Sequence, residues 1–261
     1  YTGWYTLSLH DALPIFLNPS ASHFSFGKHE VRRRLVLEGS RAFGVSYLYA
    51  NLLGNEAGRV IYDGDALIAT AGELLAEAPR FSFTEGHLIS ATIDVELTRT
   101  RHAWRSSHHP RLAAAEDSVV ELDWSPPTDA QPVEPSGAAP WERAAQLRFE
   151  EFTRAMALGL FDYCRKSRSN GFVVSLSGGA DSAAVAVLVR YMVELAIQDL
   201  GLQGLAAKLP QTPGLQSARS PSQCVEHLLT TAYQSTRNSS EVTRSAARDV
   251  AEAVGARHFE F

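Results

Sequence analysis

The sequence is poor in the residues that mark several common protein classes. Its 261 residues include two cysteines, Cys164 and Cys224, too few for a disulfide framework and without the spacing of a zinc site. The nine histidines are scattered and show no metal-ligand spacing either. The longest apolar run, around 183–189, is far too short to cross a bilayer. We therefore expect a cytoplasmic protein, in a reducing compartment, without a membrane partner.

An excess of positive charge is also absent. The formal net charge is −5, so no basic surface for nucleic acid is expected. The composition, 45% hydrophobic and 20% charged, is ordinary for a globular protein, and the length suits one large domain or two medium ones. Neither a Walker A sequence nor G-x-G-x-x-G occurs, which argues against a P-loop NTPase and a dinucleotide-binding Rossmann fingerprint.

Both ends of the chain look unusual. Residues 1–16, "YTGWYTLSLHDALPIF", lack an initiator Met and the features of a signal peptide, and they resemble a translated sequencing adapter. We treat this segment as non-native. The last residues, "ARHFEF", resemble the start of a strand. We expect the native protein to be longer at both ends.

The zone 17–124 predicts one helix followed by short strands. The helix covers 30–43 and is ended by Gly44. Strand-like runs follow at 45–51, 59–63, 66–70, 73–78 and 87–95. Asp63-Gly64 predicts a two-residue hairpin, and Ala71-Gly72 marks the next turn. A helix before a β-meander suggests part of a layered α/β domain.

A linker and a second zone follow. Residues 125–140 hold five prolines and almost no bulky apolar groups, which predicts a surface connection between domains. In 141–261 helices and strands alternate, with helices at 141–166 and 183–200, strands at 171–176 and 228–233, and a helix ending at Gly255 behind capping-box spacing at Asn238–Glu241. This alternation predicts parallel pairing in a doubly wound sheet.

One motif stands between two apolar runs, "FVVSLSGGADSAAVAVL" at 172–188. We expect it to join a central parallel strand to a helix at the carboxyl edge of the sheet, where ligands bind in open α/β folds. Gly178 and Gly179 allow a tight turn that brings N–H groups to a ligand. Ser182 opens the helix, whose N-terminus favours an anion, and Ser177 adds a second hydroxyl.

Asp181 adds a carboxylate to this motif, which would repel a phosphate. A bound Mg²⁺ resolves the conflict, because it takes one oxygen from Asp181 and others from the phosphates. The motif therefore predicts a loop that holds a pyrophosphate group together with its metal ion. A plain turn is the alternative explanation, and the complete SGGxDS string argues against it because it is more specific than the glycine pair alone.

The motif "SLSGGADS" resembles the PP-loop of the ATP pyrophosphatase family. Its neighbours, "LGLFDYCRKSRSNGF" and "LLTTAYQSTRNSSEVTRSAARDVAEAVGA", are similar to the synthetase domain of glutamine-dependent NAD synthetases. Upstream, "NPSASHFSFGKHEVRRRLV" and "GELLAEAPRF" resemble the second half of their nitrilase-like glutaminase domain. The resemblance implies the C-terminal half of a nitrilase-like α-β-β-α domain at 17–124. It also implies the start of a doubly wound, adenine nucleotide alpha hydrolase-like domain at 141–261.

The resemblance implies a ligase that forms a C–N bond. ATP would adenylate deamido-NAD, and ammonia from glutamine would then give NAD, AMP, pyrophosphate and glutamate. The partners would be deamido-NAD, ATP and glutamine, with Mg²⁺, in a homo-oligomeric full-length enzyme. The residues that match the family's ATP-binding loop are Ser175, Leu176, Ser177, Gly178, Gly179, Ala180, Asp181 and Ser182, with Asp181 as the magnesium ligand. Ser22 and Lys28 match its glutamine-binding residues.

The chain departs from the family in its glutaminase half. The family's catalytic Glu, Lys and Cys precede the "NPSAS" segment, so no catalytic residue is assigned here and the chain alone is expected to be inactive. Cys164 and Cys224 are interpreted as structural thiols. The run Arg32–Arg34 is interpreted as a solvated helix face or a domain contact. Two alternatives stay open: another PP-loop amidotransferase, of the GMP or asparagine synthetase type, and a chain that only binds nucleotide.

Overall fold

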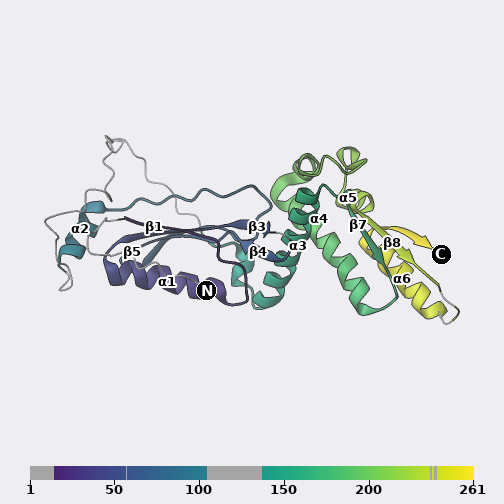
Figure 1. Cartoon of the computed structure of the whole chain (residues 1–261), viewed down its shortest axis with the longest axis horizontal. Helices are drawn as coiled ribbons and strands as arrows, with labels where there is room; N and C mark the ends of the chain where they lie inside the picture. Colours follow the sequence, from purple (N-terminus) through teal and green to yellow (C-terminus); the bar gives the residue numbers. More distant parts are fainter. Residues whose placement is uncertain (1–14, 57, 105–136, 236, 238–239) are drawn as a thin grey trace.

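The protein is described by a computed structural model that covers residues 15–56, 58–104, 137–235, 237 and 240–261. It has a mixed α/β fold. Figure 1 shows an elongated molecule with a sheet toward each end and the helices α3 (Leu147–Ser167) and α4 (Ala180–Lys208) between them. No helix in the described part of the chain is both long and apolar enough to span a bilayer.

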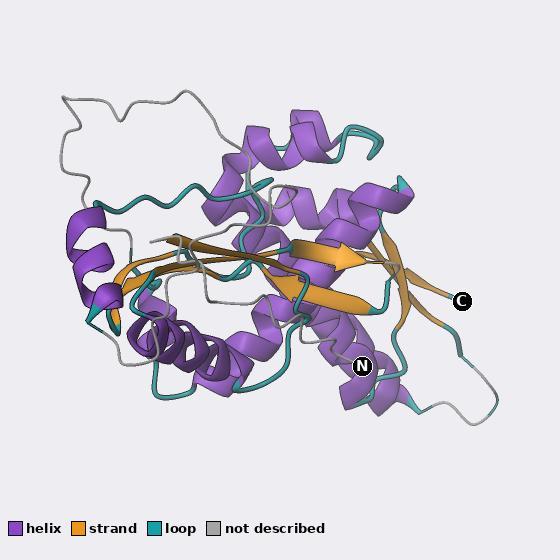
Figure 2. Ribbon diagram, turned by 60° about the vertical axis from the view of Figure 1, so that its left-hand side comes forward, coloured by secondary structure: helices purple, strands orange, loops and turns teal. Residues whose placement is uncertain are grey.

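The first sheet has four strands in the order β1-β2-β5-β6. They are β1 (Ile15–Ser20), β2 (Ser46–Asn51), β5 (Ala66–Thr70) and β6 (Glu73–Glu77). The β1–β2 pair is parallel and the other pairs are antiparallel. Helix α1 (Lys28–Phe43) lies along this sheet (Figure 2). Its Val36 is buried in one hydrophobic cluster with Tyr47 and Leu67. It ends where predicted, at Gly44, whose φ of 65° allows its N–H to bond to the Ser40 carbonyl.

The predicted hairpin at Asp63-Gly64 is wrong. Strand β4 (Val60–Asp63) pairs with β3 (Leu53–Glu56), a strand that was not predicted, while β5 joins the four-stranded sheet. At this turn the chain leaves one ladder for another, and the Asp63 carboxylate is buried in an ion pair with Arg32. The turn at Ala71-Gly72 is confirmed. It joins β5 to β6 with φ of 58° and 91°, which suits a tight hairpin.

The predicted strand at 87–95 is wrong as well. Residues 87–94 form no strand, and α2 (Val95–Ala103) begins at their end. Leu88 is 97% exposed, so the alternating pattern has no sheet to pack on. Asp94 instead accepts a hydrogen bond from the Leu97 amide at 2.8 Å, which starts the helix.

Two predicted segment boundaries fall partly outside the described residues. Ile15 and Phe16, assigned above to a non-native segment, lie in β1 and pair with β2, while 1–14 are outside the described ranges. Of the predicted linker, 125–136 are outside them too, and Pro140 begins the short helix η2 (Pro140–Arg143).

The second sheet is parallel, as predicted. Its order is β7-β8-β9, with β7 (Phe172–Ser175), β8 (Leu229–Tyr233) and β9 (Arg257–Glu260). Strand β7, expected to be central, lies at an edge of the described sheet, because β8 pairs with both of the other strands. The short helix η3 (Leu215–Ser217) and helices α5 (Pro221–Leu228) and α6 (Glu241–Val254) complete this part of the molecule.

Several helix boundaries differ from the prediction. The helix expected at 141–166 consists of the short η2 and then α3, which begins at Leu147, and α1 begins at Lys28, two residues earlier than expected. Helix α4 starts at Ala180, so Asp181 and Ser182 lie in its first turn. Its chain continues through a kink at Gly201, where φ is 71° and ψ is 170°, to Lys208. Helix α6 begins at Glu241, and its N-cap is Ser240, whose side chain accepts a hydrogen bond from the Thr243 amide. The predicted cap, Asn238, is outside the described residues.

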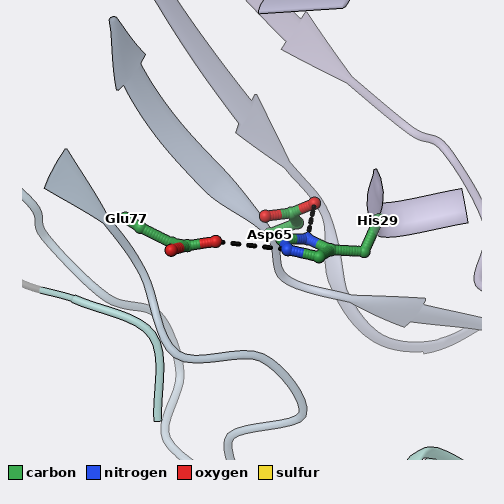
Figure 3. A group of neighbouring side chains, drawn as sticks. All are labelled: His29, Asp65 and Glu77. Carbon is green, nitrogen blue, oxygen red and sulfur yellow. Dashed lines mark hydrogen bonds and ion pairs between the residues drawn. The ribbon is translucent and has the colours of Figure 1, made fainter. Parts of the chain in front are cut away.

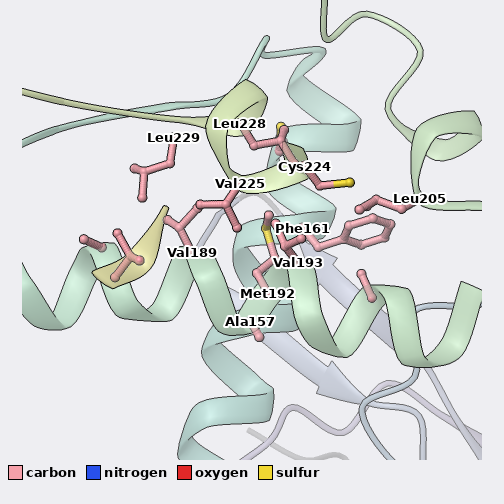
Figure 4. Packing of buried hydrophobic residues seen from close by; sticks show 14 of the residues in the cluster. Ala157, Phe161, Val189, Met192, Val193, Leu205, Cys224, Val225, Leu228 and Leu229 are labelled. Atoms are coloured by element: carbon pink, nitrogen blue, oxygen red, sulfur yellow. The ribbon is translucent and has the colours of Figure 1, made fainter. Parts of the chain in front are cut away.

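The main hydrophobic core lies around α4. Figure 4 shows Phe161 of α3, Met192 and Val193 of α4, and Leu228 of α5 packed together. Two aromatic residues that follow β6, Phe81 and Phe83, belong to the same core. The segment after the first sheet is therefore built into the core of the second part.

Candidate functional site

The SGGxDS motif forms a loop between β7 and α4. The buried Leu176 donates its N–H to the Ala232 carbonyl at 2.8 Å and continues the parallel pairing by one residue. The chain then turns at Gly178, where φ is 77°, and a Cβ there would lie 2.4 Å from the Thr243 carbonyl oxygen. A side chain at Gly178 would thus be both strained and blocked, so the loop requires glycine.

Two serine hydroxyls organise this loop from within. The Ser177 N–H donates to Ser182 Oγ at 3.2 Å, and the two hydroxyl oxygens are also 3.2 Å apart. The Gly179 N–H donates to Ser177 Oγ at 3.3 Å. Because both serines carry lone pairs and protons that remain near solvent, the loop can reorient its hydroxyls toward a ligand.

The eight residues expected to bind ATP are contiguous, but they occupy different structural positions. Ser175 ends β7 and is exposed, Leu176 is buried, and Gly179 is the N-cap of α4. Ala180 and Asp181 are exposed in the first turn of α4. The Asp181 side chain has no hydrogen-bond or ion-pair partner among the described residues. Free backbone N–H groups at a helix start attract anions, and an exposed carboxylate beside them suits a hard cation such as Mg²⁺.

The second pair of predicted residues lies in the other part of the molecule, where the chain passes from β1 to α1 (Figure 1). Lys28 is the first residue of α1, and its ammonium donates to the His23 carbonyl at 2.9 Å. Partial burial and, next, the positive charge of Arg32 lower the pKa of Lys28. The Ser22 N–H donates to the Asn51 side chain at 2.8 Å. Lys28 therefore contacts the backbone of the residue that directly follows Ser22.

Arg32 was interpreted as a surface residue or a domain contact, and the surface interpretation is wrong. Its side chain is buried, and Nη1 contacts both carboxylate oxygens of Asp63 at 2.7 and 2.8 Å. Burial alone would lower the pKa of Arg32, but the charge and hydrogen bonds of Asp63 raise it above its usual value. The next residue along the helix, Arg33, is half-buried and Arg34 is exposed.

A buried histidine lies beside this ion pair (Figure 3). His29 Nδ1 is 3.0 Å from Asp65 Oδ2, and Nε2 is 3.2 Å from Glu77 Oε1. Burial alone would lower the pKa of His29, but the two carboxylates raise it to about 9. Three such side chains can hold a metal ion, yet here both ring nitrogens already face a carboxylate. The geometry describes an imidazolium that neutralises two buried acids.

A second buried arginine, Arg80, connects the two parts of the molecule. Its guanidinium contacts Glu142 of η2 at 2.6 Å and Glu151 of α3 at 2.9 Å, and lies 3.7 Å from Asp63. Sequence reasoning did not identify Arg80 or Asp63 as paired residues. The two glutamates that pair with Arg80 are 62 and 71 positions away from it, so no local periodicity could reveal these pairs.

Neither cysteine is placed to act as a nucleophile. Both side chains are buried, and burial raises the pKa of Cys164 to about 11 and raises that of Cys224. A thiol with a raised pKa carries little thiolate at neutral pH, in line with the structural role expected for both.

These features define a parallel α/β unit with a glycine-rich, hydroxyl-lined loop at the start of a long helix. Residues 152–242, which include that loop, match the family model for NAD synthase. The chain is 35% identical to the glutamine-dependent NAD(+) synthetase of Bos taurus and 31% identical to that of Oryza sativa, over 95% and 96% of its length.

Solved structures agree with these matches. The crystal structure of a glutamine-dependent NAD(+) synthetase from Cytophaga hutchinsonii superposes with a TM-score of 0.70 at 39% identity, over 95% of this chain and 36% of that one. The structure of a glutamine-dependent NAD+ synthetase from Acinetobacter baumannii in complex with adenosine diphosphate superposes with a TM-score of 0.54 at 17% identity, and it supports the fold alone. The chain is therefore related, over nearly its whole length, to part of the glutamine-dependent NAD(+) synthetases. It spans about 36% of the Bos taurus relative.

Proposed function

We propose that this chain is part of an enzyme that makes NAD from deamido-NAD, with ATP as the source of energy and glutamine as the source of ammonia. The observation that carries the proposal is the loop 177–182, which lies at the carboxyl end of a parallel strand and inside the segment that matches NAD synthase. The relatives named above support glutamine as the nitrogen source.

In this proposal the loop binds the phosphates of ATP. Helix α4 presents its first N–H groups from Ala180 onward, and the Ser177 and Ser182 hydroxyls lie 3.2 Å apart beside them. These donors would stabilise the negative charge that grows on the departing pyrophosphate. Asp181 and a loop hydroxyl are oxygen donors of the kind that Mg²⁺ prefers. When bound there, Mg²⁺ would neutralise phosphate charge.

The chemistry explains why ATP is needed. A carboxylate is a poor acceptor for ammonia, because oxide would have to leave. Attack of the nicotinate carboxylate on the α-phosphate forms a C–O–P linkage and releases pyrophosphate. Ammonia then attacks the carboxyl carbon, and AMP leaves with the bonding electron pair. The products are NAD, AMP and pyrophosphate, and the amide nitrogen comes from glutamine with release of glutamate.

The proposal also divides the chain. Residues 17–124 would be the C-terminal half of a nitrilase-like glutaminase domain and 125–140 a linker. Residues 141–261 would begin a doubly wound synthetase domain. Ser22 and Lys28 would contact the glutamine substrate, and the family's Glu, Lys and Cys would come from sequence outside this chain. A homo-oligomer is expected of the whole enzyme.

The test replaces Asp181 by alanine in a complete enzyme that contains this chain. Pyrophosphate release from ATP and deamido-NAD should fall to background across a range of Mg²⁺ concentrations, while the thermal midpoint stays close to that of the unchanged enzyme. Asp249→Ala is the matched control, because Asp249 is also an exposed aspartate, on α6. Near-normal pyrophosphate release by Asp181→Ala would remove Asp181 from the site. Release with XMP or aspartate, but not with deamido-NAD, would favour the GMP or asparagine synthetase alternative.

A further inference from the structure

The backbone at Ser22 and His23 is held in place by two side chains from other elements, the buried Arg32 and the half-buried Asn51. Arg32 of α1 donates through Nη2 to the Ser22 carbonyl at 2.8 Å and to the His23 carbonyl at 3.2 Å, and through Nε to Ser22 Oγ at 3.3 Å. Asn51 of β2 accepts from the Ser22 N–H at 2.8 Å and donates to its carbonyl at 2.9 Å. All the polar groups of Ser22 thus have a partner.

Arg32 can hold this backbone from a buried position because a carboxylate neutralises the positive charge of its guanidinium. Nη1 meets the fully buried Asp63 carboxylate, which also accepts from Asn51 at 3.1 Å. A guanidinium is a rigid planar fork that donates in several fixed directions, whereas a lysine ammonium is a single point charge on a flexible stem. Lysine at this position would keep the charge on Asp63 and lose contacts with Ser22 and His23.

The consequence for Lys28 comes through the His23 carbonyl. This oxygen accepts from both Arg32 and Lys28, at 3.2 and 2.9 Å. Within the described ranges, the Lys28 ammonium donates to this carbonyl alone. An ammonium has three N–H donors, so two stay available for an anionic group.

We propose that Arg32 is a positioning residue for the amino-acid substrate. It fixes Ser22 and the His23 carbonyl, and through that carbonyl it aims the Lys28 ammonium at the α-carboxylate of glutamine. The inference rests on the proposed function for the identity of the substrate. It adds a residue, Arg32 with its counter-ion Asp63, that would not touch the substrate itself.

The experiment compares Arg32→Lys with Arg34→Lys in a complete enzyme that contains this chain. Arg34 is the matched control, since it lies on the same helix and is exposed. With glutamine as the nitrogen source, Arg32→Lys should raise KM for glutamine at least about tenfold, the effect of losing one charge-assisted hydrogen bond. With ammonium salts as the nitrogen source, the rate of NAD formation by Arg32→Lys should stay within about twofold of that by Arg34→Lys, because ammonia bypasses this site.

Each outcome supports or overturns the inference. An equal loss with glutamine and with ammonia would mean a structural role only, and an unchanged KM would mean no role at all. If Arg32→Lys does not fold, Asn51→Ala tests the same segment with the Arg32–Asp63 ion pair kept, and it should show the same difference between glutamine and ammonia. If the unchanged enzyme does not use glutamine, the proposed function fails. In that case, hydrogen exchange of residues 20–28 in this chain tests the positioning role by itself, because Arg32→Lys should make these backbone amides exchange faster.

Discussion

His29 lies between two carboxylates in a region that water scarcely reaches. Its side chain is 11% exposed, while that of Asp65 is fully buried. Burial disfavours the charged imidazolium, and the nearby Arg80 disfavours it further, but the hydrogen bonds with Asp65 and Glu77 outweigh both and raise the pKa to about 9. The protonated ring therefore stabilises the fold, since it compensates two acids that are costly to bury alone.

The sign of the pH dependence follows from this raised pKa. A histidine in the unfolded chain has a pKa near 6.5, so the folded state binds the proton more tightly. The stabilisation is complete below about pH 6.5 and is lost as the pH rises through about 9. Its upper limit is on the order of 3 kcal/mol. We expect His29→Gln to reduce the free energy of unfolding more at pH 6 than at pH 9.5.

Urea unfolding followed by circular dichroism measures this difference. The control is His23→Gln, since His23 is exposed in the loop before α1. An equal effect of His29→Gln at both pH values would show that the ring is neutral in the folded protein.

At the scale of an element, the strand–loop–helix unit depends on two adjacent glycines with different roles. Gly178 has a left-handed φ and lies against the backbone of α6, while Gly179 has an ordinary φ of −98°. A Cβ at Gly179 would lie 3.3 Å from the Ser177 hydroxyl, which is a side chain that can move. The pair looks equivalent in the sequence and is not equivalent in the fold.

We expect Gly178→Ala to destabilise the protein by roughly 1–3 kcal/mol, because the strained backbone and the clash with Thr243 add to each other. Gly179→Ala should cost less than about 1 kcal/mol. Thermal unfolding of the two variants, side by side with the unchanged chain, measures both. Equal destabilisation would mean that α6 does not hold the loop as described.

The local signals in the sequence predicted some elements well and others poorly. Helix α1 and strand β7 follow from apolar periodicity and from glycines that must stop or turn the chain, as Gly44 and Gly178 do. The strand expected at 87–95 failed because alternation does not say whether a partner strand exists. The Asp63-Gly64 hairpin failed for a related reason, since a turn signal does not say which strand will be the partner, and β4 pairs with β3 instead of β5.

The candidate site shows the same limit. The loop 177–182 is contiguous in the sequence, so its residues and their order along the strand, loop and helix could be read directly. The environment of Ser22 could not, because Arg32, Asn51 and Asp63 come from three different elements. The sequence alone does not show which charged residues, far apart along the chain, form ion pairs with one another.

At the scale of the molecule, the part that contains the four-stranded sheet and the β3–β4 pair is joined to the part with the parallel sheet by a buried junction. Phe83 contacts Phe161 of α3 with ring centroids 5.1 Å apart. The Asp162 carboxylate of α3 accepts the Asn55 N–H at 2.7 Å. Asp199 of α4 accepts from the Phe83 N–H at 3.0 Å. Such apolar contacts and hydrogen bonds favour one cooperative unit over two freely moving domains.

Arg80 is the charged centre of this junction, and its removal gives the sharpest test of cooperativity. Arg80→Met keeps much of the side-chain volume but leaves Glu142 and Glu151 buried without their cation. Loss of one partner of a buried ion pair costs about 3–5 kcal/mol. In calorimetry we expect the variant to have a lower midpoint than the unchanged protein. We also expect its unfolding to split into two transitions, because the first sheet would unfold without the second.

Two further variants show whether charge is the cause. Arg41→Met removes an exposed arginine paired with Glu38 and should leave the transition single and close to its original midpoint, because solvent screens that pair. Adding Glu142→Gln and Glu151→Gln to Arg80→Met should recover part of the lost stability, because neutral amides are far less costly to bury than unpaired carboxylates. No recovery would mean that Arg80 stabilises the junction through its packing on Phe81 and Trp141, whose ring centroids lie 5.5 and 5.3 Å from its guanidinium carbon.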